Sequence, residues 1–155
     1  MLRSAFAVAG LLALTAPALA QQKMIWHLQD SDDTAAIVFG VPDSDEAAIF
    51  FLCKKDGAAL TVQSMIGSKD LTRGAETALV LSAGSIKKSL PGKAVAMEEG
   101  DAVDVEAPAQ MADLKAFAKA SGNLTIEVKG AKRAIPLAGM GAVVTKFEAA
   151  CKPKS

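Results

Sequence analysis

The 155-residue chain carries 17 basic and 17 acidic residues, so neither sign of charge is in excess. Binding to nucleic acid or to an anionic membrane surface needs a basic footprint, and this balance argues against both kinds of partner. The chain has no Tyr and a single Trp, which argues against a large aromatic-rich binding surface.

The N-terminus has the three parts of an export signal. Arg3 supplies a positive charge, residues 5–14 are apolar, and Ala18-Leu19-Ala20 is typical of a cleavage site. The apolar stretch is shorter than the ~20 residues of a membrane span, and an uncleaved anchor is the alternative. We therefore predict a signal peptide at 1–20, one β-rich domain at 21–155, and a bacterial protein in the periplasm or the medium. No integral membrane segment is expected after signal cleavage.

The first part of this domain reads as short apolar or alternating segments separated by turns. Turns about 8–12 residues apart favour an antiparallel sandwich or barrel over βαβ units. Residues 47–53 are a continuous apolar run, which is typical of a strand buried on both faces. Strands are predicted at 24–29, 34–41, 47–53, 58–66, 75–81, 85–90, 93–97 and 102–106.

The later part adds two helices and a further hairpin. A helix is predicted at 111–120, then strands at 123–129 and 133–137, then a last helix at 142–151. Val144, Phe147 and Cys151 share one stripe of that helix, and this stripe should face the core. The predicted fold class is α+β and β-rich: an antiparallel sandwich or barrel-like sheet with two helices, the C-terminal helix packed on the sheet.

Cys53 and Cys151 are the only cysteines. A metal pair and a catalytic thiol are the alternatives to a disulfide, but zinc sites and nucleophilic cysteines both want histidine partners, and the chain has one His. Since exported cysteines tend to oxidise, we predict a structural Cys53–Cys151 disulfide. It would close a loop of roughly 100 residues, for which chain entropy predicts ~4–5 kcal/mol. Cys53 alternates in phase with Phe51, so both thiols point inward if the last helix lies over this strand.

His27 is the only imidazole, and as a neighbour of Trp26 it should face the opposite side of the first strand. A general base or a metal ligand is one interpretation; without a second ligand or a fixed carboxylate, a structural or surface histidine is the other. Gly139-Met140-Gly141 precedes a helix as a phosphate-binding loop does, but a third glycine is missing, so we predict a flexible turn.

Two acidic turns are candidate cation sites. Residues 30–33 and 43–46 are rich in Asp, yet neither has the spacing of an EF-hand loop. Asp and Ser are also ordinary turn residues. If the first three strands form a meander, the two turns lie at opposite ends and cannot share a cation. No metal, cofactor or catalytic residue is predicted.

A carboxylate pair would be the first candidate for a hydrolase. Asp101, Asp104 and Glu106 lie close together, and the period of two puts Asp104 and Glu106 on one face of a strand. A solvated strand edge explains the same spacing equally well.

The layout resembles a group of small exported bacterial proteins of unknown function. The residues that carry the resemblance are Trp26 in the first strand, Phe50–Cys53 (FFLC), Ile135–Gly139 (IPLAG) and Phe147–Cys151 (FEAAC). This ending is also similar to that of invasion-associated locus B proteins. The resemblance implies no activity and carries over no catalytic residue.

From these features we predict an exported, non-enzymatic domain that binds or inhibits another envelope or secreted protein. A carboxylate-dependent hydrolase and a structural envelope protein are the two alternatives.

Overall fold

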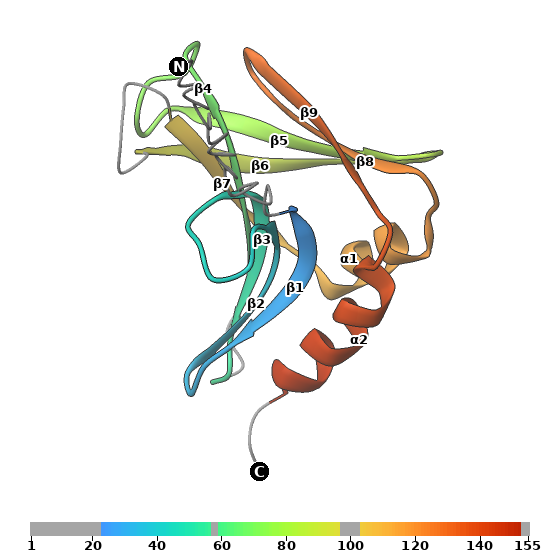
Figure 1. The fold of residues 1–155 in the computed structure, drawn as a ribbon. Coiled ribbons are helices and arrows are strands. Elements are labelled where there is room, and N and C mark those ends of the chain that lie inside the picture. The colour runs from blue at the N-terminus through green and yellow to red at the C-terminus, as the bar shows by residue number, and fades with distance from the viewer. Residues whose placement is uncertain (1–22, 57–58, 97–102, 153–155) are drawn as a thin grey trace, which may run out of the picture.

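The computed structural model of the protein describes residues 23–56, 59–96 and 103–152, and the strands in these ranges form one nine-stranded antiparallel sheet (Figure 1). The sheet curls into a half-barrel, and helices α1 and α2 lie on its concave side. The predicted fold class is therefore confirmed, including the C-terminal helix on the sheet. The predicted signal peptide at 1–20 and the segment between the predicted strands at 93–97 and 102–106 lie outside the described residues.

The elements follow the predicted order along the chain. They are β1 (Ile25–Asp30), β2 (Thr34–Gly40), β3 (Ala47–Lys54), β4 (Leu60–Ser68), β5 (Glu76–Ala83), β6 (Ile86–Ala96), β7 (Val103–Ala109), α1 (Met111–Lys119), β8 (Asn123–Val128), β9 (Ala131–Pro136) and α2 (Met140–Ala150). In space the strands run β1-β2-β3-β4-β7-β6-β5-β8-β9. After the β1–β4 meander the chain passes to β5 and returns through β6 to place β7 beside β4, which is a Greek-key arrangement.

One predicted division of the chain is wrong, and several element ends differ from the predicted ones by a few residues. From the sequence we predict separate strands at 85–90 and 93–97, whereas β6 runs unbroken through Pro91 and Gly92. Pro91 is paired with Ala78 of β5, but the β6–β7 ladder covers only Lys93 to Ala96. The missing N–H of Pro91 therefore falls where β7 forms no ladder, a position at which proline is tolerated.

Alternation along the strands separates two faces of the sheet. The inner face turns toward the helices and holds the core, and the outer face turns away from them. The largest fully buried side chains are Phe51, Phe117, Phe147, Ile37, Ile49, Leu79, Leu81, Leu114, Leu124, Ile126, Ile135 and Met140. Phe51 of β3 and Phe147 of α2 both belong to this core. Burial of such side chains stabilises the fold by ~1.5–3 kcal/mol each.

The two outermost strands of the sheet are joined through side chains at one end of the half-barrel. The Trp26 indole Nε1 of β1 donates a hydrogen bond to the Pro136 carbonyl of β9, at 2.7 Å. Arg133 Nη2 lies 3.1 Å from Met24 Sδ at the same seam. Trp26 also packs on Phe39, with ring centroids 5.2 Å apart. These contacts close the curl over the core without a backbone ladder between β1 and β9.

Candidate functional site

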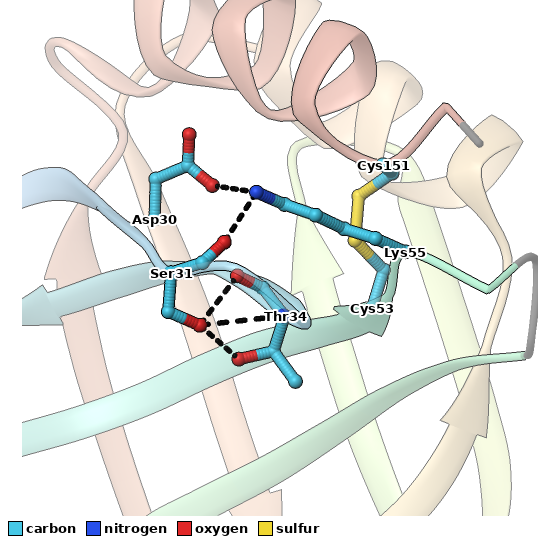
Figure 2. Close-up of a disulfide and its surroundings, with 6 residues drawn as sticks. All are labelled: Asp30, Ser31, Thr34, Cys53, Lys55 and Cys151. Atoms are coloured by element: carbon cyan, nitrogen blue, oxygen red, sulfur yellow. Dashed lines mark hydrogen bonds and ion pairs between the residues drawn. A yellow bond between two sulfur atoms is a disulfide. The ribbon is translucent and has the colours of Figure 1, made fainter. Parts of the chain in front are cut away.

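The structure contains the predicted disulfide, which joins Cys53 of β3 to Cys151 at the end of α2 (Figure 2). The Cα atoms are 5.9 Å apart, and Cys53 is buried on the inner face as its alternation predicts. The helix itself, however, packs mainly on β1 and β2 rather than directly over β3. The disulfide therefore links the C-terminal end of α2 to β3, a strand that lies outside the main contacts of the helix.

The acidic turn after β1 is engaged in structural contacts beside the disulfide (Figure 2). Lys55 Nζ lies 2.6 Å from Asp30 Oδ1 and donates a hydrogen bond to the Ser31 carbonyl. Ser31 Oγ in turn donates to the Thr34 carbonyl at 3.0 Å. These bonds connect the β1–β2 turn to the β3–β4 turn, and they pair Asp30, one of the three carboxylates of the 30–33 segment, with Lys55.

The other candidate cation ligands are dispersed. The register of β1, β2 and β3 places turns 30–33 and 43–46 at opposite ends of β2, as the meander predicts. Within the described ranges, no cluster of three or more His, Cys, Asp or Glu side chains could hold a metal ion. Gly139 adopts φ 89° as the N-cap of α2, whereas Met140 and Gly141 already lie in the helix, so the predicted turn at 139–141 is confirmed only at Gly139.

His27 lies on the outer face, opposite to Trp26, as expected. It is paired with Val38 of β2, and its Nδ1 lies 3.1 Å from the Ile25 carbonyl. Its Nε2 is buried and has no hydrogen-bond partner among the described residues. In the part of the chain that the structure describes, no hydrogen bond or ion pair links this ring to a carboxylate, and the sequence has no second His, so these residues assemble no base or metal site here.

Asp104 and Glu106 share the outer face of β7, as their spacing predicts, but they differ in environment. Asp104 is 3 % exposed, whereas Glu106 is exposed. Burial raises the pKa of Asp104, and hydrogen bonds from Gln63 Nε2 (3.4 Å) and from the Gly67 backbone lower it in part. Oδ1 of Asp104 has no partner in the described part of the chain. The third member of the predicted set, Asp101, lies outside the described residues.

The bulge of β4 explains how Asp104 is buried. Between Ser64 and Ser68 the register of β4 against β7 shifts, so β4 carries extra residues opposite Asp104. Ser68 is also buried, and its hydroxyl donates to the Lys129 carbonyl at the β8–β9 turn. A bulge of this kind re-aims side chains and bends the strand. Asp104 is thus enclosed beneath the bulge rather than presented to a substrate.

Among the described residues, two grooves line the outer face on either side of β4. We call the first the turn groove: it has a volume of about 330 Å³ and is lined by Gln29, Ala36, Val38, Ser44, Asp45, Ala47, Phe50, Leu52 and Met65. We call the second the proline groove: it has a volume of about 420 Å³ and is lined by Thr61, Glu76, Pro91, Gly92, Lys93, Val95, Glu106, Ala107 and Pro108. Pockets that bind small ligands commonly have volumes of about 300–1,000 Å³, and both grooves fall in the lower part of this range.

The proline groove forms at the end of the β6–β7 ladder. Pro91 and Pro108 both lie past the last paired residues of that ladder, and neither can donate a backbone hydrogen bond. Gly92 allows the close approach nearby, because a Cβ there would lie 2.5 Å from the Glu106 carbonyl oxygen. Above the groove, Lys93 forms an exposed ion pair with Glu76 at 3.3 Å.

The turn groove was not predicted from the sequence. Phe50 and Leu52 were assigned to a strand buried on both faces, but the structure leaves them half-buried on the outer face. Their apolar character on that face was the available signal. Nothing in the local sequence of β4 or β7 indicated that Gln63 and Asp104 would meet across the β4–β7 pair.

Comparisons with protein-family models, with curated proteins and with solved structures find no match. The fold and the outer face define a disulfide-linked antiparallel half-barrel with helices on one face and two grooves on the other. Neither α1 nor α2, the helices of the described ranges, is long and apolar enough to cross a membrane. The disulfide is compatible with a location outside the cytoplasm.

Proposed function

We propose that the mature chain is an exported, non-enzymatic binding domain that recognises or inhibits another envelope or secreted protein through the outer face of its sheet. The observation that carries the proposal is the contrast between the faces. Helices cover the inner face, while the outer face keeps Phe50, Leu52 and Met65 half-buried in the lining of the turn groove. Apolar groups grouped on an exposed surface are typical of interaction sites.

The rest of the molecule supports this proposal through its rigidity. Within the described residues the disulfide, the Trp26–Pro136 hydrogen bond and the paired strands hold the outer face in one shape. A site built on strands loses little conformational entropy when a partner binds. The export signal predicted at 1–20 would bring such a domain to partners in the envelope or the medium.

Site-specific photo-crosslinking tests the proposal. The crosslinking residue p-benzoylphenylalanine replaces Leu52 in one full-length variant and Thr145, on the exposed side of α2, in the control. Irradiation of cells that express each variant should give a discrete crosslinked species from position 52 and none from position 145. Equal crosslinking from both positions, or none from position 52 and from a second outer-face site at Thr61, would contradict the proposal.

A carboxylate-dependent hydrolase is the second candidate, because Glu76 and Glu106 line the same proline groove. Asp104, the predicted partner of Glu106, is not part of that lining, and its burial leaves Glu106 as the exposed carboxylate of the pair. If the groove were catalytic, Glu106→Gln would abolish hydrolysis of a substrate found by screening glycosides and esters, while Glu127→Gln on β8 would leave it unchanged.

A further inference from the structure

The turn groove combines an apolar floor with an acidic wall. Val38, Phe50, Leu52 and Met65 present carbon atoms from β2, β3 and β4, and Asp45 stands at the rim. No Lys or Arg belongs to the described residues that line it. Such a site favours a guest with an apolar body and a positive charge next to it, since apolar burial and charge attraction then act together.

The acidic wall is held in place by bonds within the turn itself. The Val41 N–H donates to the Glu46 carbonyl at 2.8 Å, and Ser44 Oγ donates to the Val41 carbonyl at 3.1 Å. At Gly40 a Cβ would lie 2.5 Å from the Glu46 carbonyl oxygen, so the turn folds back tightly against the end of β2. The wall therefore exists before any partner arrives, which lowers the entropic cost of binding.

The charge of this wall is not neutralised by the described chain. Asp43, Asp45 and Glu46 are all exposed, and no hydrogen bond or ion pair within the described residues engages the Asp45 carboxylate. Asp30, at the opposite end of β2, differs from Asp45 because its carboxylate is ion-paired with Lys55. An external cation is the natural counter-charge for Asp45.

The second groove, across β4, also carries carboxylates, although its Lys93 is ion-paired with Glu76. Leu52 is paired with Thr61, and Thr61 with Pro108, so one row of residues leads from the turn groove to the proline groove. Neighbouring strands are ~4.8 Å apart and an extended chain rises ~3.3 Å per residue, so about three residues of an extended segment span the row. Glu106 lies in the second groove, and no ion pair in the described chain engages it.

We propose that the turn groove binds an extended polypeptide segment of the partner in which apolar residues alternate with Lys or Arg. An apolar side chain enters between Phe50 and Leu52. The neighbouring Lys or Arg leaves the segment on the opposite side, and its long flexible stem bends back over the rim so that its charge pairs with Asp45. This inference rests on the proposed function and names the chemistry of the partner. The segment crosses β4 toward Glu106. An anionic partner is disfavoured, because its charge would face the three carboxylates of the turn.

The test is an NMR titration of the ¹⁵N-labelled mature chain with capped peptides. The probe is acetyl-Leu-Lys-Leu-Lys-Leu-Lys-amide, and the matched peptides replace every Lys by Glu or every Leu by Ser. The Leu-Lys peptide should shift the amide signals of Val38, Phe50 and Leu52 in a saturable way, while the other two peptides should not. Saturable binding of the Leu-Glu peptide, or shifts confined to the helices, would overturn the inference.

Two variants test the contacts separately. Asp45→Asn should weaken the Leu-Lys peptide about two- to fivefold, as expected for loss of one exposed ion pair, and Phe50→Ala should weaken it further through loss of apolar contact. Asp32→Asn, in the exposed turn at the other end of β2, is the matched control and should have no effect. Because Asp45 is exposed, its variant folds normally; unchanged affinity in that variant would contradict the assigned ion pair.

This inference and the proposed function can fail separately. If position 52 crosslinks to an envelope protein but the Leu-Lys peptide does not bind, the cationic chemistry is overturned and the binding face stands. If no outer-face position crosslinks, the proposed function falls whatever the peptide does.

Discussion

Both faces of the sheet carry apolar side chains, but those of the inner face form the core, whereas some of those on the outer face line the turn groove. Phe50 and Phe51 are neighbours on β3, yet Phe51 is 2 % exposed in the core while Phe50 lies half-buried in the turn groove. The difference arises because α2 covers only the inner face, where Phe147 joins the core. An apolar strand residue therefore contributes to stability on one face and remains available for binding on the other.

The phenylalanine pair gives the largest expected effect. Phe51→Ala should lower the free energy of unfolding by about 3–5 kcal/mol, because it leaves a cavity in a packed core. Phe50→Ala, the matched change on the outer face, should cost about 1 kcal/mol, since water already reaches this ring. Urea unfolding of the two variants measures both values. Equal losses would show that the outer face is as tightly covered as the inner one.

Removal of the disulfide should have the next largest effect. The double change Cys53→Ser and Cys151→Ser should lower the free energy of unfolding by ~2–4 kcal/mol, because the unfolded chain regains the freedom of a long loop. The native fold should persist, since the α2 side chains Val144 and Phe147 remain buried. Thiol titration of the purified wild-type mature protein is the companion measurement, and free thiols there would contradict the disulfide.

The seam between β1 and β9 should contribute less. Trp26→Phe keeps an aromatic ring on the inner face but removes the hydrogen bond to the Pro136 carbonyl, which is worth ~0.5–1.5 kcal/mol. Some packing is lost as well. Hydrogen exchange in β9 should become faster than in the central strand β3. Uniform exchange in all strands of the variant would indicate that this bond does not close the half-barrel.

Asp104 should give the smallest effect, and the effect should depend on pH. Its folded pKa is raised by burial, so the folded protein holds this proton more firmly than the unfolded chain does. Stability from this group is therefore present below the unfolded pKa of ~3.8 and is lost as the pH rises through the higher folded pKa. Asp104→Asn should be more stable relative to wild type at pH 7 than at pH 3.

Denaturant unfolding of wild type and variant at a series of pH values measures this difference. Glu106→Gln is the control, because Glu106 is exposed on the same face, and its free energy of unfolding should differ from that of wild type by no more than about 0.5 kcal/mol. If the free energy of unfolding of Asp104→Asn minus that of wild type falls as the pH rises from 3 to 7, the assigned environment of this carboxyl is contradicted.

Local patterns were sufficient to predict most elements and the disulfide. Period-two alternation located the strands, and the helical stripe of Val144, Phe147 and Cys151 identified the inward side of α2. These signals are local, because each follows from the geometry of one strand or helix. They failed at Pro91-Gly92, where the consequence of a proline depends on which neighbouring strand is present.

The sequence by itself determined a β-rich chain with paired cysteines and with Trp26 and His27 on opposite faces of the first strand, since these follow from alternation and composition. Only the tertiary structure decided that β7 lies between β4 and β6, that the bulge of β4 encloses Asp104, and that two grooves flank β4. The physical reason is that strand order and register join residues far apart in the chain. The strand propensity of a segment does not specify which distant strand will pair with its edge.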